Sequence, residues 1–190
     1  MIITINGDEG SGKTTVAKKL AEKINFTRYT TGEIFREMSK KRGLSLVEYL
    51  KLGETDPSID KEVDDYVIKL SKEQDNFIID SRVAWHFIPN SIKIYLKVAE
   101  EEGAKRIYKE ILEKNNRNET KKPPASVDYV MKKVQERRET DDKRYMQYYG
   151  INIRNKNNYD FVVDTTDLDP EQVFEKVLGF IQSKINEKSS

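Results

Sequence analysis

The sequence of 190 residues contains no cysteine and only one histidine, His86. Without cysteine there are no disulfides, thiolate zinc sites or cysteine nucleophiles, and a single histidine rules out a histidine-rich metal centre. No stretch approaches the roughly 18 consecutive apolar residues of a membrane span. The formal net charge is only +1, so no strong overall field favours nucleic acid or an anionic membrane. We therefore expect a soluble, cytoplasmic protein with neither of these partners.

Short apolar runs and helical patterns alternate along the chain. Helical spacing predicts helices over 13–24, 100–114, 127–148 and 170–185, and a series of helices within 31–74. In that series we expect Thr31 to cap the first helix and Pro57 to lie in the first turn of the third. Strands are expected at 1–6, 26–30, 76–80, 92–98 and 159–165. Because strands joined by helices form parallel sheets, these elements predict an α/β fold with a five-stranded parallel sheet and helices on both faces. Ligands of such sheets bind beyond the carboxyl ends of the strands.

A glycine-rich loop lies between the first strand and the first helix, in the segment ITINGDEGSGKTTVAKKL at residues 3–20. Gly7 to Thr14 fit the phosphate-loop (P-loop) pattern G-x-x-x-x-G-K-[ST] at every fixed position. In such loops backbone N–H groups surround a polyphosphate, the lysine reaches the outer phosphates and the following hydroxyl binds magnesium. We predict that ATP phosphates are bound by Gly7, Asp8, Glu9, Gly10, Ser11, Gly12, Lys13, Thr14 and Thr15, and that Thr14 is also a ligand of Mg2+.

Asp8 and Glu9 are unusual neighbours for a polyphosphate. Since backbone amides bind the phosphates, we expect these two side chains to point to solvent, with some loss of ATP affinity relative to neutral residues.

Other classes of P-loop protein fit the sequence poorly. A GTP switch needs D-x-x-G after the loop, and no glycine here has an aspartate three residues before it. A hydrolytic ATPase usually carries a glutamate next to the magnesium-side aspartate, whereas Asp80 is followed by Ser81. These absences favour a kinase of a small anionic acceptor.

Two motifs resemble those of nucleoside monophosphate kinases. TGEIFRE at 31–37 resembles their [ST]-G-[DE]-x-x-R element, and DSR at 80–82 resembles D-G-x-R. The later segments ERRETDDKRYMQYYGINI and YDFVVDTTDLDPEQVFEKV are most similar to archaeal-type cytidylate kinases, and the order of elements matches over nearly the whole chain. The resemblance implies ATP with Mg2+ as the phosphoryl donor and CMP or dCMP as the acceptor.

The same resemblance implies how the chain is divided. It gives one P-loop kinase domain over 1–190, with a core of 1–30, 75–114 and 126–190. The helical insert 31–74 becomes the monophosphate-binding region, and the polar segment 115–125, which carries two prolines, becomes a short lid. We expect a monomer.

Site residues follow from the motif positions. The resemblance places Arg36 and Arg82 on the acceptor phosphate, beside Thr31 and Gly32, and gives Asp80 a role in supporting Mg2+. Arg137 and Arg144 fall on an R-x-x-x-D-x-x-R pattern with Asp141 and should face the phosphates. The implied catalytic residues are Lys13, Arg82, Arg137 and Arg144.

Positive charge gathers in the region that would clamp phosphates. Residues 101–158 contain 15 Lys and Arg against 10 Asp and Glu, whereas residues 33–80 contain 8 against 12. We nevertheless interpret Arg138 and Arg154 as solvated residues of an exposed face. Two departures from the family pattern stand out: Ser81 occupies a position where glycine is commoner, and Asp8-Glu9 replaces a proline-bearing loop.

Base recognition points to the insert. Cytosine presents an amino donor where uracil has a carbonyl, so its reader should be an acceptor. Asp60 and Asp64 lie one helical turn apart, and Asp64 is the favoured reader. The alternative is that both acids only solvate the helix.

Two other functions remain open at this stage. The acceptor can be AMP, UMP or shikimate instead of CMP. Outside the kinases, the chain can be a nucleotide-binding protein that hydrolyses ATP slowly and acts through a partner.

Overall fold

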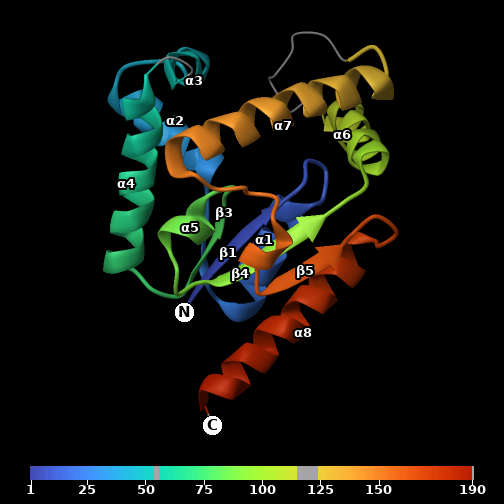
Figure 1. The fold of residues 1–190 in the computed structure, drawn as a ribbon. Coiled ribbons are helices and arrows are strands. Elements are labelled where there is room, and N and C mark those ends of the chain that lie inside the picture. The colour runs from blue at the N-terminus through green and yellow to red at the C-terminus, as the bar shows by residue number, and fades with distance from the viewer. Residues whose placement is uncertain (54–55, 115–123, 190) are drawn as a thin grey trace. The chain divides into compact units, whose positions relative to one another are not determined.

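The computed structural model describes residues 1–53, 56–114 and 124–189 (Figure 1). Apart from Pro124 and Ala125, the predicted lid at 115–125 lies outside the described residues. The elements are β1 (Ile2–Gly7), α1 (Lys13–Ile24), β2 (Thr27–Thr30), α2 (Thr31–Lys41), α3 (Leu46–Gly53), α4 (Pro57–Glu73), β3 (Phe77–Asp80), α5 (Ala84–Phe87), β4 (Ile92–Lys97), α6 (Glu100–Lys114), α7 (Val127–Tyr149), the 3-10 helix η1 (Lys156–Asn158), β5 (Phe161–Asp164) and α8 (Pro170–Ser189).

The strands form one five-stranded sheet in the order β2-β3-β1-β4-β5. β3 pairs in parallel with β1 on one side and β2 on the other, in a register that aligns Asp80 with Ile5 and with Thr30. The predicted five-stranded parallel α/β fold is therefore confirmed. Among the described residues no helix is long and apolar enough to cross a membrane.

Contacts divide the chain into two compact units. The first comprises Met1–Asn6 and Thr14–Ile94, and the second comprises Gly7–Lys13 and Tyr95–Ser190.

The first unit contains the helices between β2 and β3 (Figure 1). α2, α3 and α4 bury a shared apolar cluster that extends onto β3, and its largest members include Tyr49, Ile59 and Phe77. On the surface of this cluster Arg42, at the end of α2, pairs with Glu62 of α4 at 2.8 Å, and Glu62 also accepts a hydrogen bond from the Tyr49 hydroxyl. In its described residues the predicted all-helical insert thus consists of three packed helices.

Local signals set the bounds of these helices. Pro57 occupies the first turn of α4, as predicted, and Asp56 before it accepts a hydrogen bond from the Ser58 N–H. We expected Thr31 to cap α2, but the cap is Thr30. Thr30 has an extended backbone and its Oγ1 accepts the Glu33 N–H, so Thr31 is already the first helical residue.

In the second unit α7 packs on α6 through a small apolar cluster around Ala104, Ile107 and Val130. α7 is capped by Ser126 and ends at Gly150, whose φ of 66° is the left-handed conformation that favours glycine. α8 covers β5, where the Phe161 and Phe180 rings stack with centroids 4.4 Å apart.

Two short elements were not predicted. α5 has four residues and η1 has three, so neither is long enough to show a helical period. α8 also runs four residues beyond the predicted end at Ile185.

Candidate active site

The P-loop follows β1 and belongs to the second unit. The Lys13 ammonium donates to the carbonyls of Gly7 and Asp8, both at 2.8 Å. The Ser11 hydroxyl donates to the Asp8 carbonyl at 2.7 Å. The lysine therefore lies inside the curve of its own loop, bonded to carbonyl groups that an anionic ligand of Lys13 would displace.

Close backbone contact fixes the loop against α6. A Cβ on Gly10 would lie 2.3 Å from the Gly103 carbonyl oxygen, and a Cβ on Gly103 would lie 2.5 Å from the Glu9 carbonyl oxygen. The Asp8 N–H also donates to the Leu96 carbonyl at 2.9 Å. Glycine at both Gly10 and Gly103 is what allows the loop to approach the helix so closely.

The prediction that Asp8 and Glu9 point to solvent is wrong. Only 10% of the Asp8 side chain and 9% of the Glu9 side chain are exposed. Asp8 accepts hydrogen bonds from the Tyr95 hydroxyl at 2.7 Å, the Val98 N–H at 3.1 Å and Arg154 at 3.2 Å. Buried carboxylates need such partners because the charge is otherwise costly to desolvate.

Arg138 and Arg154 are likewise not solvated, contrary to our interpretation. Arg138, with 13% of its side chain exposed, donates from Nε to Glu9 at 2.8 Å. Arg154, with 20% exposed, bonds Asp8 and lies 3.7 Å from Glu9. The sequence signal was available: two acids in a loop that must pack against a sheet require counterions, and arginine suits carboxylates best.

Lys156 completes the charged surroundings of Asp8. Its ammonium lies 3.1 Å from the centroid of the Tyr95 ring, a cation–π contact, while the Tyr95 hydroxyl bonds Asp8. Burial lowers the pKa of Lys156 to about 8, although nearby Asp8 opposes this change. Burial and the Asp8 charge raise the pKa of Tyr95, which therefore stays a neutral donor.

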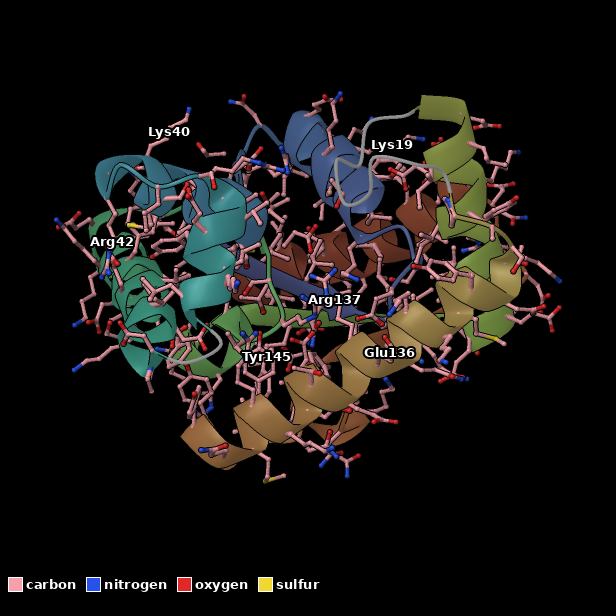
Figure 2. All side chains as sticks on the ribbon, turned by 90° about the horizontal axis from the view of Figure 1, so that it is seen from above. Lys19, Lys40, Arg42, Glu136, Arg137 and Tyr145 are labelled. Atoms are coloured by element: carbon pink, nitrogen blue, oxygen red, sulfur yellow. The ribbon has the colours of Figure 1, made fainter. Side chains whose placement is uncertain are left out.

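The R-x-x-x-D-x-x-R residues come together on α7, where Figure 2 labels Arg137 and Tyr145. Asp141 is buried, with Arg137 at 3.9 Å and Arg144 at 3.2 Å from its carboxylate. The guanidinium of Arg144 also donates to the Tyr145 hydroxyl at 3.2 Å and lies over the Tyr145 ring. About half of the Arg137 side chain is exposed (54%), so it is available to a ligand in solvent.

In the first unit the predicted metal residues are in direct contact. The Thr14 hydroxyl, at the start of α1, donates to the Asp80 carboxylate at 2.8 Å, at the end of β3. A hydroxyl and a carboxylate are hard oxygen ligands of the kind Mg2+ uses, with water and phosphate oxygens filling the other positions. These two residues therefore fit the implied ion. The described residues contain no cluster of three or more His, Cys, Asp or Glu that would hold a metal by side chains alone.

Residues predicted to bind the acceptor follow the ends of β2 and β3, which are neighbours in the sheet. Thr31 donates from its hydroxyl to the Asp80 carbonyl at 3.3 Å. A Cβ on Gly32 would lie 3.9 Å from a terminal nitrogen of Arg36, so the Arg36 guanidinium folds back over the first turn of α2. Arg36 itself is exposed.

Arg82 lies in the turn between β3 and α5 and is partly buried. Its carbonyl accepts the Trp85 indole N–H at 2.9 Å. The preceding Ser81 is buried, and its hydroxyl oxygen accepts the N–H groups of Val83 and Ala84. A serine at this position therefore organises the turn that carries Arg82.

Asp60 and Asp64 both lie on the buried side of α4, each 7% exposed. This contradicts the alternative that they only solvate the helix.

Residues 2–167 match the model of the Cytidylate kinase-like family. A cytidylate kinase of Methanocaldococcus jannaschii is 37% identical over 188 residues, 96% of this chain and 98% of the relative. A cytidylate kinase of Pyrococcus abyssi is 36% identical over 175 residues, 92% of this chain and 90% of the relative.

Among solved structures, a shikimate kinase from Bacteroides thetaiotaomicron superposes with a TM-score of 0.63 and covers 98% of both chains. Its sequence is only 14% identical, so this likeness concerns the fold alone.

Proposed function

Because the chain belongs to the cytidylate kinase-like family, we propose that it transfers the γ-phosphoryl group of ATP to CMP, and also to dCMP. The observation that carries the proposal is the match over 2–167, together with relatives named cytidylate kinase that align over nearly their whole length. The family membership that the sequence motifs predicted is confirmed.

On the donor side, the P-loop amides and Lys13 bind the ATP phosphates. Binding requires the Lys13 ammonium to exchange the Gly7 and Asp8 carbonyls for phosphate oxygens. That exchange replaces neutral acceptors with charged ones, and charge-assisted hydrogen bonds are the stronger kind. Thr14 and Asp80 would hold Mg2+, which when bound neutralises charge on the outer phosphates.

On the acceptor side, Arg36 and Arg82 hold the phosphate of CMP within the region of Thr31 and Gly32. Each arginine follows the carboxyl end of a strand, which is where open α/β sheets bind ligands. The insert 31–74 binds the nucleoside, and Asp64 accepts the cytosine amino group. Its burial on α4 supports this role because a desolvated carboxylate discriminates strongly between a donor and a carbonyl.

The chemistry needs little acid–base catalysis, since the acceptor phosphate is already an oxyanion. Rate enhancement comes from alignment of the two substrates and from neutralisation of the transferring group by Lys13, Arg137 and Arg144. This division of labour is compatible with a chain whose only histidine, His86, lies in α5 and packs against Trp85 and Phe87. We further propose that the protein is a cytoplasmic monomer.

A coupled assay of ADP release tests the function. The assay runs with ATP and Mg2+ over CMP, dCMP, UMP, AMP and shikimate, with a no-acceptor reaction as control. We expect release to depend on the acceptor and CMP to give the highest kcat/KM. Equal ADP release with and without every acceptor would establish the hydrolase instead, and preference for another acceptor would reassign the substrate.

A further inference from the structure

The side chains of the P-loop acids connect the loop to the helix that carries Arg137 and Arg144. Glu9 accepts the Nε–H of Arg138 at 2.8 Å, and Asp8 lies 3.7 Å from the same guanidinium. The Glu9–Arg138 bond joins positions 129 residues apart in the sequence. The side chains of Asp8, Glu9 and Arg138 are each at most 13% exposed. The loop and α7 are thus joined by an ion pair that is largely shielded from solvent.

Charged groups from three further segments complete the network. Glu100 of α6 accepts Nη1–H of Arg138 at 2.7 Å. Arg154, after α7, pairs with Asp8 and also with Asp142 of α7 at 3.2 Å. Lys156 lies over the Tyr95 ring that bonds Asp8. Every charge of the network therefore has an opposite charge or a π face beside it.

The loop side of this network cannot shift easily. The backbone at Glu9 and Gly10 is in close contact with Gly103 of α6, and the Asp8 N–H is bonded to Leu96. The two carboxylates therefore offer a fixed surface against which α7 is placed.

The helical period determines which side chains of α7 face the P-loop acids and which lie on the adjacent face. Arg138 and Asp142, four residues apart, share one face of α7, and both pair with this network. Arg137, Asp141 and Arg144 share the adjacent face, because successive residues are separated by 100°. Holding the first face on the loop leaves α7 a single rotation, and that rotation decides where Arg137 and Arg144 point.

We propose that Asp8 and Glu9 are positioning residues: their carboxylates fix the rotation of α7 through Arg138 and Arg154 and so orient Arg137 and Arg144 for phosphoryl transfer. The proposal rests on the proposed function for the roles of those two arginines. The role of the two loop carboxylates is then to orient α7 and not to contact ATP. Buried ion pairs add little net stability compared with apolar packing, but they can specify one arrangement, which is the property this role needs.

A double-mutant cycle tests the proposal, with Glu9→Gln, Arg138→Gln and the pair combined. We expect each single change to lower kcat at least tenfold while the Kd of ATP changes less than threefold, because the loop amides and Lys13 are retained. The combined variant should lie within threefold of the poorer single variant, since each change removes one charge of the same ion pair. A kcat within threefold of wild type, or losses that multiply in the combined variant, would overturn the proposal.

Glu100→Gln is the matched control. It removes a carboxylate from the same guanidinium but leaves the Glu9 contact in place. We expect kcat within twofold of wild type, and a loss equal to that of Glu9→Gln would refute the specific role of the loop. Arg138→Lys keeps the positive charge but lacks the Nε–H that bonds Glu9. If Glu9→Gln does not fold, Arg138→Lys takes its place in the comparison, and we expect the same tenfold loss of kcat.

Hydrogen exchange separates this proposal from the proposed function. Without any substrate, Glu9→Gln should raise the exchange rate of amides in 137–145 at least tenfold over wild type and over Glu100→Gln. Unchanged exchange overturns the positioning role even in an active kinase. Faster exchange in a protein that does not phosphorylate CMP would leave the orientation device standing and remove only the assigned reaction.

Discussion

The Thr14 hydroxyl donates to the Asp80 carboxylate at 2.8 Å, which joins the first helix to the end of β3. The two residues are 66 positions apart, and the sheet places them together because β3 pairs directly with β1, the strand that leads into the P-loop. A hydroxyl held on a carboxylate is poised to exchange that bond for a shared cation.

Asp80→Asn should raise the Mg2+ concentration needed for half-maximal activity and lower kcat by about 100-fold, the scale of losing one charged contact in a transition state. The amide keeps the volume and can still accept the Thr14 hydrogen bond, so the fold should be retained. Activity measured over a Mg2+ titration at saturating ATP and CMP checks this. Asp75→Asn changes an exposed acid just before the start of β3, at the opposite end of the strand from Asp80, and this control should titrate like wild type. An unchanged Mg2+ midpoint would remove Asp80 from the metal site.

Lys13→Ala should lower kcat/KM by about 100- to 1,000-fold, because a preorganised positive charge at the transferring phosphate contributes roughly 3–4 kcal/mol. The change also removes the two bonds to the Gly7 and Asp8 carbonyls, so melting temperature without ATP is measured alongside the rate. Loss of rate in a variant that melts within a few degrees of wild type supports a direct role. If the rate falls only in proportion to the folded fraction, Lys13 is structural.

Much of this site could be predicted from the sequence where the signal is local. Pro57 and the glycine pattern of the P-loop each act within a few residues, and the structure shows α4 and α1 with the predicted starts. The predicted cap of α2, Thr31, is one residue away from the observed cap, Thr30. Adjacent threonines offer the same hydroxyl, and only the backbone conformation distinguishes them.

The acidic network shows why other features could not be predicted. Asp8 and Arg154 are 146 residues apart, and no periodicity relates them. Reading the arginines of 137–154 one at a time treats each as a surface charge, which is the usual state of arginine. Only the fold shows that Arg138 and Arg154 pair with the two loop acids, Glu9 and Asp8.

Arg144→Ala should lower kcat by about 100-fold while the Kd of ATP changes much less, the signature of a contact made mainly in the transition state. Arg144 is held by Asp141 and Tyr145, so its guanidinium is already oriented without substrate. Steady-state kinetics together with direct ATP binding checks this. Lys143→Ala changes an exposed neighbour and serves as the control. A matching loss of ATP affinity with kcat preserved would make Arg144 a ground-state binding residue.

Asp64→Asn should reduce the preference for CMP over UMP by at least tenfold. The carboxylate accepts the amino group of cytosine, whereas an amide can also donate to the uracil carbonyl. The ratio of kcat/KM values for the two nucleotides is the measurement. Asp65→Asn alters the next residue, which is exposed, and should leave the ratio unchanged. If Asp64→Asn also leaves it unchanged, the base is read elsewhere.

Lys156 should make stability depend on pH. Burial lowers its pKa in the folded protein to about 8, below the 10.5 of the unfolded chain. Between these values the unfolded state binds a proton that the folded state does not, so the free energy of unfolding attributable to Lys156 rises with pH. The side chain is partly exposed, and solvent screening reduces the effect to about 1 kcal/mol, or about 2–4 °C in Tm. The raised pKa of Tyr95 acts in the opposite direction at higher pH, which sets 9.5 as the upper limit of the test.

The measurement compares Tm of wild type with Lys156→Met at pH 7.0 and pH 9.5. Methionine keeps an unbranched apolar stem of similar length beside the Tyr95 ring but cannot titrate. The difference in Tm, wild type minus variant, should become more positive by a few degrees between the two pH values, because only wild type sheds the buried charge. Lys143→Met, at an exposed position of α7, should show the same difference at both pH values. A constant difference for Lys156→Met as well would mean that Asp8 and the Tyr95 ring hold the ammonium charged throughout this range.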